Sequence, residues 1–224
     1  PGQSRHGDYE GLENWIFNES ISSFFSNIGF DYSQIKSNPV NNFVVHSANK
    51  DPLLVDSKEP FFYLVKRGDK NNDFDNQLYQ QCKDVGVEFR FNTTASDKCE
   101  IVSTGTRKAS AYINGSSFRT SQKNQVHLLL GHEFSPKGYA YLIIHNGYGT
   151  IATAFKKVKN TKHNYLNNCK KYFRELDIDI SNEQDFGSRG SFAFSLSRIS
   201  LPLQIGEAGG FQDYLFGVGM KMSM

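Results

Sequence analysis

A glycine-rich segment late in the chain, residues 205–220, holds the residue types best suited to bind a nucleotide or a flavin. It reads IGEAGGFQDYLFGVGM, in which an apolar stretch runs into a carboxylate and then into a second glycine pair. A carboxylate just past a strand end can accept hydrogen bonds from sugar hydroxyls, and glycines let a ligand approach the backbone. A helix start offers unpaired N–H groups to a phosphate or an electron-rich ring. The alternative is that these glycines serve only chain geometry. The candidate ligand-binding residues are Gly206, Glu207, Gly217, Gly219 and Met220.

The elements that must position this segment follow from the hydrophobic periodicity. An all-β stretch from about 110 to 155 stands between segments that mix helices and strands, so we expect an α/β chain with an inserted antiparallel β-sheet domain. Asn-Gly pairs at 114–115 and 146–147 are typical of hairpin turns. The pattern predicts helices at 18–29 (with Asn18 as N-cap), 73–85, 161–176 and from about 217, and strands at 61–66, 87–91, 99–103, 110–119, 126–131, 138–145, 148–155 and 201–205.

Composition excludes several classes of protein. The net charge of +2 over 224 residues gives no case for a nucleic-acid partner. The three cysteines, Cys82, Cys99 and Cys169, form no CxxC pair, and the histidines lack zinc spacing, so we expect no metal site. Few cysteines fit a reducing, cytoplasmic location. No apolar run approaches the roughly 20 residues of a membrane span.

Three motifs in the same order resemble one family. The tail GEAGGFQD...GVGM resembles the second FAD-contacting motif of flavoproteins with the p-hydroxybenzoate-hydroxylase type of fold, in its geranylgeranyl-reductase-like branch. Arg67 followed by Phe74-Asp75-x-x-Leu78 and Gly86-Val87 resembles a second family stretch. Residues 101–105 (IVSTG) resemble the strand and turn in which relatives carry Ala-Asp-Gly or Ala-Thr-Gly.

The resemblance implies a flavoenzyme, with FAD as cofactor and NAD(P)H as a candidate electron donor. The first expectation is reduction of a carbon–carbon double bond in an apolar, isoprenoid or lipid-like substrate. The alternatives are a flavin monooxygenase, or a non-catalytic flavoprotein remnant that binds an apolar ligand. The resemblance implies an FAD-binding domain of residues 1–38, 74–103 and 199–224, and a substrate domain of residues 39–73 and 104–198.

The chain departs from the family at its front. The family opens with a strand, a Gly-x-Gly-x-x-Gly turn and a helix, which bind the pyrophosphate, and no such run occurs here. We therefore expect an incomplete Rossmann-like FAD-binding domain and a fragment of a longer enzyme. The resemblance assigns Arg5 to the pyrophosphate.

The substrate site departs from the family as well. Residues 138–144 (GYAYLII) resemble the reductase motif Tyr-x-Trp-x-Phe-Pro, but Tyr141, Ile143 and Ile144 replace its last three named residues. The expected substrate-facing residues are Tyr139, Tyr141 and Trp15, although tyrosines are also ordinary residues of β-sheets. No catalytic residue is identified. An apolar substrate makes peripheral membrane contact possible as a further expectation.

Overall fold

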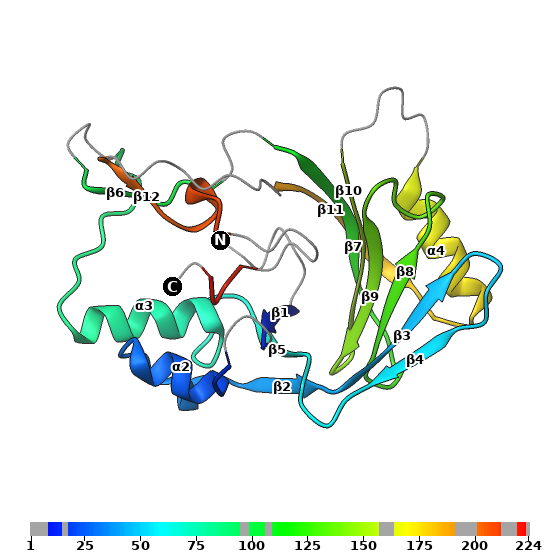
Figure 1. The fold of residues 1–224 in the computed structure, drawn as a ribbon, viewed down its shortest axis with the longest axis horizontal. Helices are drawn as coiled ribbons and strands as arrows, with labels where there is room; N and C mark the ends of the chain where they lie inside the picture. Colours follow the sequence, from blue (N-terminus) through cyan, green and yellow to red (C-terminus); the bar gives the residue numbers. More distant parts are fainter. Residues whose placement is uncertain are drawn as a thin grey trace.

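The computed structural model describes residues 9–14, 18–94, 99–105, 109–156, 164–190, 201–211 and 219–222. Among these residues, helices and strands build three sheets, with helices packed on the larger two (Figure 1). The helices are α2 (Ile21–Asn27), α3 (Phe74–Asp84) and α4 (Tyr165–Glu175), with the 3-10 turns η1 (Tyr32–Gln34) and η2 (Gly206–Gly209). The strands are β1 (Tyr9–Glu13), β2 (Ser37–Val40), β3 (Asn42–Ser47), β4 (Leu53–Asp56), β5 (Phe62–Lys66), β6 (Ile101–Val102), β7 (Ala111–Arg119), β8 (Gln125–Leu130), β9 (Tyr139–His145), β10 (Tyr148–Lys156), β11 (Ser181–Gly190) and β12 (Leu203–Gln204).

The largest sheet has seven strands in the order β11-β7-β10-β9-β8-β3-β4. Its neighbouring strands are antiparallel except for β3 and β8, which run parallel. The sheet is curved, with α4 on one face and β1, β5 and the end of the chain on the other side (Figure 1). The predicted α/β class with a large sheet is therefore confirmed, although one neighbouring pair of its strands is parallel rather than antiparallel.

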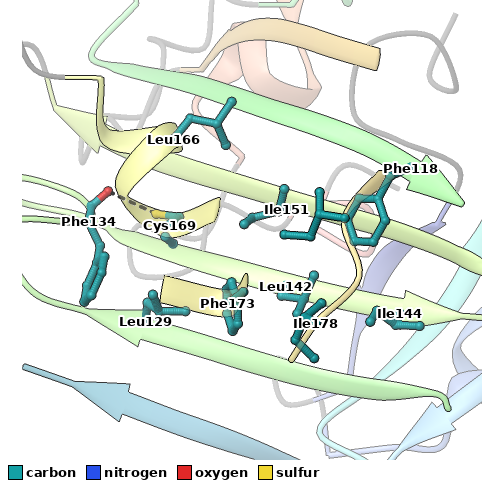
Figure 2. Close-up of a cluster of buried hydrophobic side chains, with 12 residues drawn as sticks. Phe118, Leu129, Phe134, Leu142, Ile144, Ile151, Leu166, Cys169, Phe173 and Ile178 are labelled. Atoms are coloured by element: carbon teal, nitrogen blue, oxygen red, sulfur yellow. Dashed lines mark hydrogen bonds between the residues drawn. The ribbon is translucent and has the colours of Figure 1, made fainter. Parts of the chain in front are cut away.

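The hydrophobic core of this sheet lies under α4. Leu142 and Ile151 from neighbouring strands pack in one cluster with Phe173 of α4, and none of the three exposes any surface (Figure 2). Fully burying one such side chain is worth about 1.5–3 kcal/mol. The Sγ of Cys169 lies 3.7 Å from the carbonyl oxygen of Phe134, beside the same cluster (Figure 2). This packing fixes which face of β9 points away from α4.

The alternation of β9 places two predicted substrate residues on that other face. Ala140, Leu142 and Ile144 are fully buried in the cluster beneath α4. Because successive strand residues point to opposite faces, Tyr139 and Tyr141 lie on the face away from α4. That face is the one turned toward β1 and β5 (Figure 1).

A second core joins a three-stranded antiparallel sheet, in the order β1-β5-β2, to α2 and α3. The ring of Phe25 stacks on Tyr32, with centroids 4.9 Å apart, and meets Phe74 of α3 edge-on. Leu12 of β1 and Val65 of β5 belong to the same cluster. A third sheet consists of β6 and β12, which run parallel.

The start of α2 differs from the sequence prediction. Ser20, not Asn18, is the N-cap, because its side chain accepts a hydrogen bond from the N–H of Ser23. Ile21, Phe24 and Phe25 are buried as expected. The predicted helix from about 217 begins outside the described residues. Where the chain is described again, residues 220–222 form a turn and not a helix.

Two strand-level predictions are wrong and one is confirmed. Asn146-Gly147 forms the expected hairpin turn between β9 and β10, with φ of 50° and 79°. Asn114-Gly115 is not a turn but lies inside β7, where the ring of Phe186 from β11 covers the glycine. Residues 87–91 form no strand.

Candidate functional site

The carboxyl ends of β6 and β12 meet at one edge of their small parallel sheet. The strands are joined by a hydrogen bond from the N–H of Ile205 to the carbonyl of Val102, 3.0 Å long. Parallel α/β sheets bind ligands at this edge. Gly105 follows β6 and Glu207 follows β12, and a Cβ added to Gly105 would lie 3.8 Å from Oε2 of Glu207. The carboxylate therefore sits over the turn of the neighbouring strand.

The glycines around Glu207 shape a tight turn. Gly206 and Gly210 have φ of 59° and 86°, a left-handed conformation that favours glycine. A Cβ on Gly209 would clash with the carbonyl oxygen of Gln204. These glycines therefore do serve chain geometry, which was the alternative to a ligand-binding role. That geometry also sets the position of Glu207.

Arg67, just beyond β5, connects three distant parts of the chain. Its Nε and Nη2 donate to Oδ2 and Oδ1 of Asp75 in α3, at 2.8 and 2.7 Å. Its Nη1 donates to Glu10 of β1 and lies 3.9 Å from Sδ of Met220. Burial acts to lower the pKa of Arg67, but the hydrogen bonds and charges of Asp75 and Glu10 raise it above its ordinary value. Arg67 is therefore a permanent cation beside Met220.

Asp75 accounts for the motif that begins at Arg67. It lies in the first turn of α3, where a negative charge is favourable, and its Oδ2 also accepts from the N–H of Gly68 at 2.9 Å. Burial acts to raise the pKa of Asp75, but its bonds to Arg67 and Gly68 hold that pKa below its usual value. The Arg-to-Asp spacing in the sequence is thus the spacing of an ion pair that docks α3 on β5.

Glu13, at the end of β1, holds the last described residues of the chain. Its Oε1 accepts from the backbone N–H groups of Lys221 and Met222, at 2.8 and 3.3 Å. The side chain has no exposed surface, and Oε2 has no hydrogen-bond partner among the described residues. Burial raises the pKa of Glu13 above its ordinary value, against the lowering effect of these N–H bonds and of Lys221.

The two tyrosines on β9 lie close together, and Tyr141 also lies within the field of Glu10. Tyr139 and Tyr141 have ring centroids 6.3 Å apart. Burial, followed by the nearby Tyr139 and Glu10, raises the pKa of Tyr141. The phenol therefore keeps its proton and can donate a hydrogen bond at neutral pH.

The first strand also packs directly on the large sheet. The ring of Tyr9 meets His145 edge-on, with centroids 4.8 Å apart, and lies 6.4 Å from the ring of Tyr148. Tyr9 therefore packs where the hairpin between β9 and β10 turns. This contact places β1 between the seven-stranded sheet and the end of the chain.

The structure brings only some of the predicted site residues into contact with others of the site. Gly206 and Glu207 form the turn beside Gly105, and Met220 lies against Arg67. Tyr139 and Tyr141 share one face of β9. The predicted residues Arg5, Trp15 and Gly217 lie outside the described residues.

Sequence reasoning missed Glu10 and Glu13. Their partners are far away along the chain: 57 residues separate Glu10 from Arg67, and 208 separate Glu13 from Lys221. Two acidic residues three positions apart in a sequence do not by themselves predict a binding role. The sequence motif that begins at Arg67 does not by itself indicate Glu10 as a partner of this arginine.

Neither a metal site nor a membrane-spanning helix occurs among the described residues. Those residues contain no group of three or more His, Cys, Asp and Glu side chains that could hold a metal ion. None of the described helices has the length and apolar character needed to cross a bilayer.

Comparison with known proteins gives matches in structure alone. No protein-family model matches the sequence. No curated protein matches it by sequence. A geranylgeranyl bacteriochlorophyll reductase-like protein from Thermoplasma acidophilum matches 96% of this chain with a TM-score of 0.63 at 15% identity. QhpG, a peptidyl tryptophan dihydroxylase, matches 92% with a TM-score of 0.61 at 12% identity. FqzB matches 92% with a TM-score of 0.58 at 10% identity.

These matches show that the chain shares its fold with these three proteins. The chain spans 64%, 53% and 61% of the lengths of the three proteins, in the order given. At these identities, the likeness reaches the fold and no further.

Proposed function

We propose that this protein is an FAD-dependent oxidoreductase acting on an apolar substrate, with reduction of a carbon–carbon double bond as its reaction. One observation carries the proposal: Glu207 and Gly105 meet at the carboxyl ends of two parallel strands, within a fold that this chain shares with a geranylgeranyl bacteriochlorophyll reductase-like protein. Bound FAD would supply the electron transfer, while the protein supplies orientation and electrostatics.

The proposed cofactor residues fit a flavin in chemistry. Glu207 would accept a hydrogen bond from a ribityl hydroxyl, as a carboxylate beyond a strand end can. Gly206 keeps its turn tight through its left-handed backbone. Gly219 and Met220 would lie beside the flavin pyrimidine, next to the cation of Arg67. We further propose that Arg5 meets the pyrophosphate, that Gly217 belongs to the flavin-binding tail, and that NAD(P)H is the donor.

Tyr139, Tyr141 and Trp15 are the proposed substrate-facing residues. The phenol of Tyr141 would orient a polar end of the substrate, because its raised pKa keeps the proton in place. Peripheral contact with a membrane, from which a lipid-like substrate would be taken, remains part of the proposal.

The proposed division of the chain follows the two cores. Every member of the core under α4 falls within residues 104–198. These residues form the proposed substrate domain together with residues 39–73. The other core draws on residues 1–38, 74–103 and 199–224 of the proposed FAD-binding domain, with Tyr63 and Val65 of β5 as exceptions.

The small parallel sheet supports an incomplete Rossmann-like domain. Parallel sheets are normally covered on both faces. Here Ile101 of β6 is 56% exposed, and Leu203 of β12 is 38% exposed. A further parallel strand and helix, carrying the pyrophosphate turn, would cover them. We propose that this unit lies outside the 224 residues of this chain.

The test is an absorption spectrum of the purified product of the complete gene. A flavin spectrum, with FAD released on denaturation, is the expected result. The 224-residue chain alone is expected to be colourless or to bind FAD weakly. A complete product that neither carries nor binds FAD would favour the flavoprotein remnant, a binding protein for an apolar ligand.

A monooxygenase is the second candidate, because one of the proteins with this fold is a peptidyl tryptophan dihydroxylase. Reduced enzyme mixed with oxygen separates the two. An oxygen-dependent hydroxylated product indicates the monooxygenase, and a reduced double bond formed without oxygen indicates the reductase.

A further inference from the structure

Glu13 is a buried acid with one oxygen unused among the described residues. Its side chain is 0% exposed, and only Oε1 is bonded, by the N–H groups of Lys221 and Met222. A buried polar atom without a partner costs roughly 1–3 kcal/mol. Among the described residues nothing satisfies Oε2, so this oxygen is a candidate partner for a polar atom of a bound group.

The bonding pattern of Glu13 fixes where a proton would sit. Because Oε1 already accepts from two N–H groups, a neutral Glu13 carries its proton on Oε2. Burial favours this neutral form and raises the pKa of Glu13, although the N–H bonds and the charge of Lys221 oppose it. Burial also lowers the pKa of Lys221, and Glu13 opposes that change. Oε2 would then be a hydrogen-bond donor.

The position of Glu13 ties this donor to the glycine-rich tail. β1 contacts the last described residues of the chain at two points. Glu13 accepts hydrogen bonds from the N–H groups of Lys221 and Met222. Glu10 pairs with Arg67, which in turn contacts Met220. The tail at Met220 is the part proposed to lie beside the flavin pyrimidine. An acid that fixes this tail would then lie near the same ring.

We propose that neutral Glu13 is a cofactor-binding residue, whose Oε1 positions the tail at Lys221–Met222 and whose Oε2–H donates to an oxygen or nitrogen of the flavin pyrimidine. The proposal rests on the FAD function proposed above. The ionised form would present a negative charge to an electron-rich ring and would repel it. FAD binding is therefore coupled to protonation of Glu13.

The first test measures FAD affinity against pH in the complete gene product. Between about pH 5 and 9, the dissociation constant of the wild type should rise by up to about tenfold per pH unit above the pKa of Glu13, because one proton must bind with the cofactor. Glu13→Gln, which is neutral at every pH and keeps an acceptor for the two N–H groups, should bind FAD with a flat profile. Glu88→Gln removes an exposed acid paired with Arg90 and should follow the wild type.

The second test needs no substitution and no turnover. Calorimetric titration of FAD into wild-type protein, in buffers of different ionisation enthalpy, should show uptake of about one proton per FAD above the pKa of Glu13. This measurement stands even if Glu13→Gln fails to fold.

The outcomes separate this inference from the proposed function. FAD binding with the same pH profile in the wild type and Glu13→Gln, or without proton uptake, overturns the role of Glu13 and leaves the flavoenzyme standing. Absence of FAD binding at every pH overturns both.

Discussion

Arg67 and Asp75 form a two-point ion pair, with Nε–Oδ2 and Nη2–Oδ1 distances of 2.8 and 2.7 Å. The pair joins the end of β5 to the first turn of α3. Because Arg67 also binds Glu10 and contacts Met220, one side chain sets the relative positions of three segments that the sequence separates widely. The candidate site therefore depends on this pair for its shape.

Arg67→Lys should destabilise the protein by about 1–3 kcal/mol, because a lysine keeps the charge but loses the two-point geometry. Urea unfolding monitored by circular dichroism measures the loss. Arg90→Lys is the matched control, since Arg90 pairs with Glu88 at the surface, where both side chains are 72% exposed. Its effect should stay below about 0.5 kcal/mol. Equal effects of the two substitutions would show that the Arg67 pair is not structural.

A second prediction concerns a hydrogen-bonded chain beneath α4. Gln125 donates from Nε2 to the carbonyl of Lys123, so its Oε1 accepts from Nε2 of His127 at 2.7 Å. Nδ1 of His127 must then accept from Nε2 of His46 at 2.8 Å, and Nδ1 of His46 from the hydroxyl of Tyr172 at 3.0 Å. All three links run in this direction when both histidines are neutral.

Acid should therefore weaken the protein through His127. Burial and the neighbouring His46 lower the pKa of His127 from 6.5 to about 4. Between these two pKa values, His127 is protonated in the unfolded chain but neutral in the folded protein. The free energy of unfolding therefore falls as the pH drops through this window. The loss should be on the order of 2 kcal/mol. Urea unfolding at a series of pH values measures it.

His127→Gln should flatten the stability profile in that window, because the group that gains a proton on unfolding is gone. His132→Gln, at an exposed position, is the control and should leave the slope unchanged. A slope that survives in His127→Gln would assign the acid sensitivity to other groups.

Local signals predicted the elements whose causes are local. The helix at α3 follows from Phe74 and Leu78 on one face and from Gly86, whose φ of 88° ends it. The turn at Asn146-Gly147 follows from two residues that tolerate positive φ. In each case the neighbours in sequence decide the conformation.

Distant partners explain the failures. Gly115 looked like a turn residue, but it is a strand position opened for the ring of Phe186, which β11 brings from far along the chain. Val87 to Phe91 alternate like a strand, yet the rings of Phe89 and Phe91 pack on Tyr79 of α3 instead. The short strands β1 and β2 were missed because both pair with β5, which lies more than 20 residues further along the chain.

The same distinction holds for the candidate site. Glu207 and Met220 could be proposed from the sequence because glycines mark the chain around them. Glu10 and Glu13 could not, since their roles arise only when β1 meets Arg67 and the tail.

A third prediction tests the turn that carries Glu207. Gly209→Ala should destabilise the protein by roughly 1–3 kcal/mol and weaken FAD binding, because the added Cβ would clash with the carbonyl oxygen of Gln204 and displace the turn. Gly187→Ala is the control. Its Cβ would meet the carbonyl of Ile113 at 3.9 Å, an ordinary contact on an exposed part of β11. Unchanged stability of Gly209→Ala would mean that the turn shifts without cost.

The last prediction concerns Glu207 itself. A charge-assisted hydrogen bond from a ribityl hydroxyl is typically worth about 1.5–3 kcal/mol, so Glu207→Ala in the complete gene product should weaken FAD binding by roughly 10- to 100-fold. Glu207→Gln keeps an acceptor but loses the charge, and its affinity should fall between those of Glu207→Ala and the wild type. Titration of FAD into the cofactor-free proteins, followed by flavin fluorescence, gives the three dissociation constants. Glu133→Gln, an exposed carboxylate on the turn after β8, should bind FAD like the wild type. Equal affinity of the wild type and Glu207→Ala would leave the turn after β12 as chain geometry alone.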